Sequence, residues 1–166
     1  MDSAATGRAH IRNEILGSGI SNTLFNGVIA WLLLRSSPAL RWGGEHSFVV
    51  DVIATGLLLP LIVALIVIPL QRGKLNKGKL APINLGPGSV MQSVADRFPA
   101  STFRSALVFG LIGMLLIAPL TLAGFYLLGI EEISPAHYAR FKGIWAGSSA
   151  AVLVVPMVLI ALRTPA

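Results

Sequence analysis

Charged residues divide this sequence into long charge-free runs, and the length of these runs limits the possible folds more than any other feature. Runs of 20 residues without a charge follow Glu14, Asp51 and Lys142, and a run of 26 follows Arg104. A helix rises about 1.5 Å per residue, so about 20 residues cross the ~30 Å hydrocarbon core of a bilayer. The four runs therefore predict four membrane-spanning segments.

These segments should be helices of an all-α membrane protein. Backbone groups find no hydrogen-bonding partners in lipid, so a spanning segment is either a helix or part of a closed barrel, and the continuous apolar runs lack the alternation of barrel strands. A soluble domain of 166 residues could not bury a chain that is 54% hydrophobic and 12% charged. We expect an up-down-up-down bundle with helices near 15–34, 48–70, 105–128 and 138–162.

The distribution of Lys and Arg predicts the orientation of the bundle. Nine of these residues fall on the side that carries both termini and four fall on the other side. Because cytoplasmic loops are enriched in Lys and Arg, both termini should be cytoplasmic. The predicted organisation is a cytoplasmic segment 1–14, a first transmembrane hairpin 15–70, a basic cytoplasmic loop 71–104, a second hairpin 105–162 and a cytoplasmic tail 163–166.

The same distribution identifies the environment of the chain. A net charge of +6 would suggest nucleic-acid binding in a soluble protein. Here, however, most of the Lys and Arg residues lie on one side of the spans, as expected for the cytoplasmic side of a membrane protein. We therefore expect the lipid bilayer, and no nucleic acid, as a partner. Short loops without a glycosylation sequon suit the inner membrane of a bacterium.

The loop before the third span contains a segment with helical spacing. Val90, Met91, Val94 and Phe98 recur at the spacing of one helix face, after Ser89 as an N-cap and before Pro99. One interpretation is a short interfacial helix beside anionic headgroups. The other is a solvated loop that holds two helix ends apart.

Small residues predict close helix packing. Gly143, Gly147 and Ala151 recur at four-residue intervals in the fourth span, so another helix can approach its backbone. The first span carries a comparable stripe that includes Gly19 and Gly27. The partner of either face could lie within the chain, in a second copy of the chain or in another membrane protein.

Polar residues inside the spans are the candidate site, because lipid makes each of them costly unless it is paired. Counted at 1.5 Å per residue, Asn26 and Thr55 lie roughly 10–12 Å below the outer boundary, and Asp51 lies about one turn above them. The complete predicted polar cluster is Asn22, Asn26, Asp51, Thr55, Thr121, Ser148 and Ser149.

Asp51 is the acid that falls within a predicted span. With no cation assigned to its layer, the amides of Asn22 and Asn26 are its expected donors. The alternatives are a neutral carboxyl group suited to proton coupling, and a boundary Asp that caps the second helix and reaches water.

Other chemistry is sparse in the sequence. There is no cysteine, and no phosphate loop, metalloprotease His pair or nucleophile elbow, so we assign no catalytic residue and no cofactor. Scattered acids and histidines in loops are usually solvated, so we assign no metal to the possible ligands of the outer loops, which are Glu45, His46, Glu131, Glu132 and His137. Two functions remain: a non-catalytic accessory or structural subunit of a membrane assembly, and a small transporter or permease-like protein that uses the polar cluster.

Overall fold

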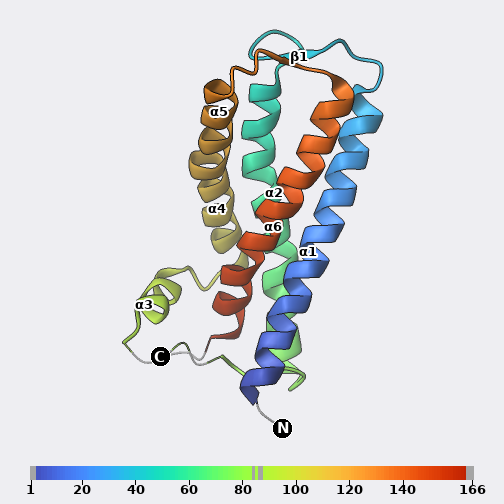
Figure 1. The fold of residues 1–166 in the computed structure, drawn as a ribbon. Helices are drawn as coiled ribbons and strands as arrows, with labels where there is room; N and C mark the ends of the chain where they lie inside the picture. Colours follow the sequence, from blue (N-terminus) through green and yellow to red (C-terminus); the bar gives the residue numbers. More distant parts are fainter. Residues whose placement is uncertain (1–2, 84, 86–87, 164–166) are drawn as a thin grey trace.

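The computed structural model describes residues 3–83, 85 and 88–163 and shows a nearly all-helical protein (Figure 1). Four helical segments are long and apolar enough to cross a membrane: Gly7–Leu34, Phe48–Asn76, Thr102–Leu127 and Pro135–Leu162. The helix α1 begins and α6 ends at the end of the bundle opposite strand β1 (Figure 1). The four apolar helices predicted from the charge-free runs are therefore present.

The first two helices are α1 (Ser3–Leu34) and α2 (Phe48–Asn76). Both continue past the bounds predicted from the apolar runs, because charged residues such as Glu and Lys are good helix formers and need not end a helix. α2 begins after Ser47, whose hydroxyl accepts a hydrogen bond from the backbone N–H of Val50. Ser47 is therefore the cap. The prediction that Asp51 could cap this helix is wrong, because Asp51 lies within the first turn.

The third spanning segment changes its helical geometry halfway. α4 (Thr102–Ile112) leads into a π-helical turn, η1 (Gly113–Ile117), which leads into α5 (Ala118–Leu127). Pro119 has no N–H, and its ring would crowd the Leu115 carbonyl in a regular α-helix. The wider turn, in which the Ala118 N–H bonds to the Gly113 carbonyl, accommodates this proline.

Close backbone contact joins this third segment to α2. A Cβ atom on Gly113 would collide with the Gly56 carbonyl oxygen, and one on Gly110 would lie 2.9 Å from the Leu57 carbonyl oxygen. Pro60 lies four residues after Gly56 inside α2, so the Gly56 carbonyl lacks its usual helical donor. The two helices therefore touch where α2 has a free carbonyl and the third segment has no side chain.

The last spanning helix, α6 (Pro135–Leu162), lies against both α1 and α2. Its buried side chains join those of α2 and α4 in the main apolar core, which includes Ile68, Phe109, Val154 and Met157. α1 contributes little to this core, because only 6% of its most apolar window is buried inside the chain. α1 is thus a peripheral helix attached chiefly through α6.

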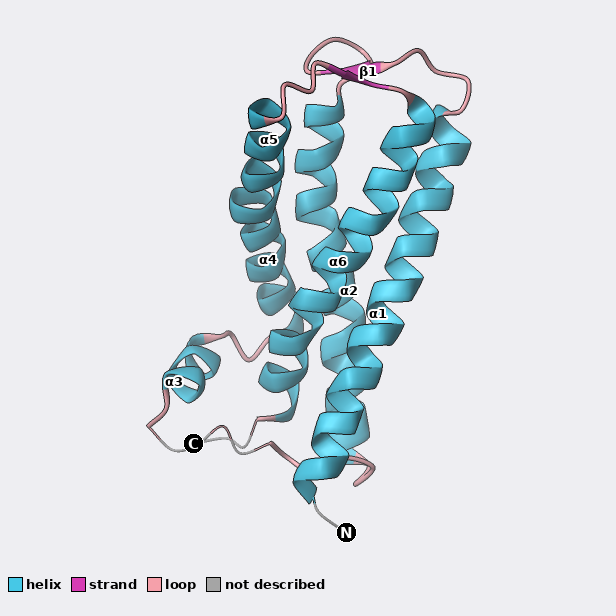
Figure 2. Cartoon of the chain, viewed as in Figure 1, coloured by secondary structure: helices cyan, strands magenta, loops and turns pink. Residues whose placement is uncertain are grey.

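Two loops are tied together at the end of the bundle that carries β1. Strands β1 (Leu40–Arg41) and β2 (Glu132–Ile133) pair antiparallel, and we call this pair the β strap (Figure 2). The Arg41 guanidinium donates to the Glu132 carboxylate at 3.0 Å, and the Trp42 indole donates to the Ile130 carbonyl at 2.7 Å. The strap therefore links the two helical hairpins.

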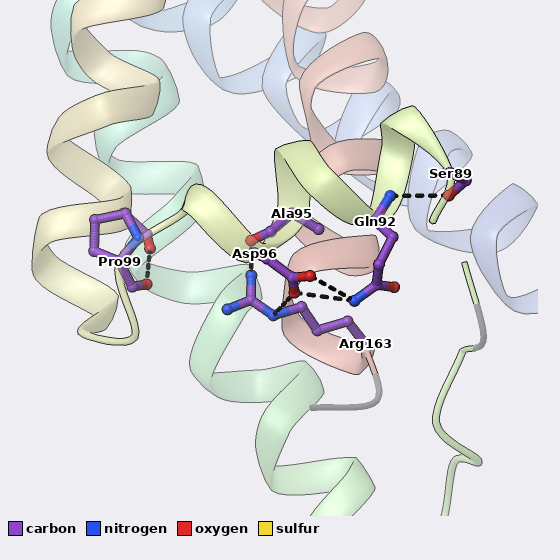
Figure 3. Close-up of polar contacts among 7 residues, drawn as sticks. Ser89, Gln92, Ala95, Asp96, Pro99 and Arg163 are labelled. Atoms are coloured by element: carbon purple, nitrogen blue, oxygen red, sulfur yellow. Dashed lines mark hydrogen bonds and ion pairs between the residues drawn. The ribbon is translucent and has the colours of Figure 1, made fainter. Parts of the chain in front are cut away.

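A short helix, α3 (Val90–Arg97), is tied to the end of α6. Ser89 caps it, and the Arg163 guanidinium reaches the Ala95 carbonyl and the Asp96 carboxylate (Figure 3). Of the two interpretations of this segment, the structure has the helical one, which begins after Ser89 and ends at Arg97, before Pro99. Its position at a membrane interface remains a prediction.

Some predicted segments lie partly outside the described residues. Arg163 is the one described residue of the tail 163–166. Residues 1–2 of the N-terminal segment and residues 84, 86 and 87 of the basic loop also lie outside.

Candidate functional site

An ion pair joins α2 to α6 near the end of the bundle that carries the β strap. The Lys142 ammonium group donates to both carboxylate oxygens of Asp51, at 2.6 and 2.7 Å, and the Tyr138 hydroxyl donates to one of them at 2.5 Å. Tyr138 and Lys142 lie one turn apart on α6 and face the first turn of α2. The Asp51 carboxylate is therefore held by two donors from one neighbouring helix.

This arrangement corrects the predicted environment of Asp51. Sequence reasoning counted Lys142 as a loop cation and assigned the amides of Asn22 and Asn26 as donors. The donors are instead Lys142 and Tyr138, so that assignment is wrong. Asp51 and Lys142 both lie within the first turns of helices that start at the same end of the bundle (Figure 1). Matching their depths would have placed both residues at one level, but it would not have shown that α2 and α6 are neighbours.

Aromatic rings pack between α2, α5 and α6 beside Tyr138, one of the donors to Asp51. Phe125 lies between Phe48 and Phe141, with ring centroids 5.4 and 4.8 Å away, and the Tyr138 ring lies 5.9 Å from that of Phe141 in a tilted arrangement. Tyr138 and Phe48 are fully buried, whereas the Asp51 side chain is 36% exposed and that of Lys142 is 14% exposed. Asp51 is therefore the more exposed partner of the pair and Lys142 the more buried one.

The asparagines of α1 are bonded within their own helix. The Asn22 amide donates to the Ser18 carbonyl at 2.9 Å, and the Asn26 amide donates to the Asn22 carbonyl at 3.0 Å. Both side chains are half-buried at the border of the α6 contact. They lie within about 4 Å of the midpoint of the charge-free run 15–34, at 1.5 Å per residue.

The remaining residues of the predicted polar cluster are dispersed. Thr121 on α5 accepts a hydrogen bond from the Trp145 indole on α6 at 2.8 Å and donates to the Ile117 carbonyl. Thr55 is buried on α2. Ser148 is exposed and Ser149 half-buried on α6. The cluster is therefore divided among several separate contacts.

The small residues of α6 face α1. A Cβ atom on Gly147 would overlap the Thr23 side chain, and one on Gly143 would lie 2.8 Å from the Thr23 carbonyl oxygen. Ala151 lies opposite Gly19, where an added Cβ atom would touch the Ala151 methyl group at 3.4 Å. We call this contact the α1–α6 seam. It uses small residues on both helices.

A second group of polar side chains lies at the opposite end of the bundle. The Lys74 ammonium group lies 3.0 Å from the Glu14 carboxylate, which joins α2 to α1. The His10 imidazole lies 2.8 Å from the side-chain oxygen of Gln71, and Gln71 is fully buried. Sequence reasoning used Glu14 to mark where a charge-free run begins and counted Lys74 only among the Lys and Arg residues of the loop. This pair therefore went unnoticed.

Comparison with protein-family models, curated proteins and solved structures finds no match for this chain. The function therefore has to be argued from the geometry. Each of the two ion pairs joins two helices, and the Asp51–Lys142 pair shows the arrangement that lets charged groups remain beside an apolar bundle.

Proposed function

We propose that this protein is a non-catalytic accessory or structural subunit of a membrane assembly, with α1 as the helix that receives a partner. It crosses the membrane in an up-down-up-down arrangement, with both termini and α3 on the cytoplasmic side of a bacterial inner membrane. The excess of Lys and Arg at the end of the bundle opposite the β strap supports this orientation.

The observation that carries the proposal is the position of the α1 asparagines. A side-chain amide has two N–H donors and a carbonyl acceptor, and one bond to the helix backbone leaves part of this capacity unused. Asn22 and Asn26 lie close to the middle of the span on a helix that is mostly uncovered. Lipid cannot satisfy such groups, whereas a neighbouring helix can, and such bonds help to drive helix association.

The exposed surface beside the asparagines can accommodate such a helix. Phe25 lies three residues after Asn22 and Ile29 three residues after Asn26, so all four side chains share one face of α1. Phe25 is 68% exposed and Ile29 is 51% exposed. The partner is a second copy of the chain or another membrane protein with a complementary polar group.

The alternative is a small transporter that uses the polar cluster. The Asp51–Lys142 pair favours it, because ionisable residues inside a span often mark a transport path. However, both oxygens of the carboxylate already accept hydrogen bonds, and the asparagines do not belong to the same network. The geometry supports the accessory role better.

Cross-linking in native membranes tests the proposal. A photo-activated residue at Phe25 should yield a cross-linked product of one defined mass, and that mass identifies the partner. The control is Val152, which is 69% exposed on α6. It should give no defined product.

Asn22→Leu combined with Asn26→Leu should reduce the Phe25 product at least several-fold. Asn13→Leu, which removes the same amide from an exposed position two and a half turns before Asn22 and so on the opposite face of α1, should leave it unchanged. Loss of the product in both variants, or in neither, would contradict the docking role. Uptake of a solute by purified protein in vesicles, abolished by Lys142→Met, would favour the transporter.

A further inference from the structure

A groove lies between the start of α1 and the end of α2, at the end of the bundle opposite the β strap. Its volume is about 560 Å³, and it combines lysines with apolar side chains. Lys74, Lys77 and Lys79 line it together with Leu70 and Leu80. We call it the lysine groove.

The lysine groove carries more positive charge than the neighbouring carboxylates neutralise. Glu14 pairs with Lys74 at 3.0 Å. Lys77 and Lys79 are exposed, and neither takes part in an ion pair among the residues that the structure describes. The groove therefore presents two uncompensated positive charges.

The backbone holds these lysines in position. After α2 ends, Gly78 adopts a left-handed conformation with φ +66°, and its N–H bonds to the Leu75 carbonyl. The Lys79 N–H then bonds to the Lys74 carbonyl at 2.9 Å. This glycine turn brings Lys79 and Leu80 back against the helix end. The groove is therefore formed by a closed helix cap rather than by an open loop.

The depth of the groove matches the boundary of a bilayer. Leu70 lies at the end of the charge-free run that follows Asp51 and is 50% exposed. Lys74 lies one turn further along the same helix, which is roughly 6 Å at 1.5 Å per residue. The apolar wall thus lies at the level of acyl chains, and the ammonium groups lie at the level of headgroup phosphates.

We propose that the lysine groove binds the phosphate of an anionic phospholipid, with the lipid chains along Leu70. Lys77 and Lys79 supply the charge, and His10, whose ring nitrogen lies 2.8 Å from the buried Gln71, supplies a further polar wall. Basic pockets at the cytoplasmic end of helix bundles suit anionic headgroups, and each lysine near such a surface strengthens binding.

Native mass spectrometry of the purified protein in mixed micelles tests this site, and it does not depend on the orientation of the protein. Phosphatidylglycerol should bind as a discrete one-to-one adduct, and phosphatidylcholine at the same concentration should bind far more weakly. Lys77→Gln combined with Lys79→Gln should lower the affinity for phosphatidylglycerol by about 30-fold, since each lysine contributes about fivefold.

The matched control removes the same charge from the same end of the molecule. Arg97→Gln combined with Arg104→Gln affects two exposed cations outside the groove and should change the affinity less than threefold. Equal weakening by both double variants, or by neither, would overturn the proposal. Displacement of the lipid by millimolar glycerol 3-phosphate would also overturn it, because it would identify a soluble phosphate compound as the ligand.

Discussion

In the Asp51–Lys142 pair, each charged group is stabilised by the opposite charge of its partner. The Lys142 side chain is 14% exposed, so its ammonium group has little access to water. Removing one partner of a buried pair strands the other charge, which commonly costs about 3–5 kcal/mol. The partial exposure of Asp51 reduces this cost.

We therefore predict that Asp51→Asn lowers the free energy of unfolding in detergent by about 2 kcal/mol. Lys142→Met should have a similar effect, and the two changes together should cost less than the sum of the single effects. The exposed Arg41–Glu132 pair is the control, and Glu132→Gln should cost under about 1 kcal/mol. Equal losses for Asp51→Asn and Glu132→Gln would show that the buried pair has no special role.

The residue scale also shows how far the sequence could predict the site. Asp51 is recognisable as a polar residue in a span, because its position between apolar residues is visible in the chain. Its partner was missed because depth counting shows which residues lie at one level but not which helices are neighbours. α6, and not α1, supplies the donors to Asp51. That adjacency depends on packing between residues 91 positions apart.

At the scale of elements, the apolar runs predicted the helices but not the irregularity inside them. Charge-free runs indicate which segments can lie in lipid, so they locate the four spans well. The π-helical turn depends on Pro119 in combination with the close contact between Gly113 and Gly56. A proline alone does not show whether a helix kinks, breaks or widens. The widened turn therefore appears only in the structure.

The contact between Gly113 and α2 should tolerate no side chain. We predict that Gly113→Ala lowers the free energy of unfolding by about 1–3 kcal/mol, since its methyl group would overlap the Gly56 carbonyl and force the helices apart. Gly124 is the matched control on the same helical segment, because a Cβ there meets no atom within 4 Å. Gly124→Ala should be neutral or slightly stabilising. Thermal unfolding of both variants in one detergent compares them, and equal loss would disprove the close contact.

At the scale of the whole molecule, the two ends of the bundle differ in charge and in construction. One end carries the β strap, and the other carries the lysine groove, the Glu14–Lys74 pair and α3. Because the chain contains no cysteine, single cysteines can report which end faces which side of the membrane.

We predict that an impermeant thiol reagent labels Ser36→Cys in intact cells, whereas Ser93→Cys is labelled only after the membrane is opened. Both serines are exposed, and neither caps a helix. Ser93 lies on α3, so it should face the same side of the membrane as the end of the bundle that carries most of the Lys and Arg residues. The reverse labelling pattern would invert the proposed orientation.

The α1–α6 seam can form only late in synthesis, after α6 has been made. α1 leaves the ribosome before α6, and roughly 120 residues separate the two sides of the seam, which takes on the order of ten seconds to translate at about 5–20 residues per second. Throughout that interval Thr23 and the asparagines of α1 lie in the bilayer without α6. An insertion factor or a partner helix that covers α1 would protect it during that interval. The two would therefore compete for the same surface of α1.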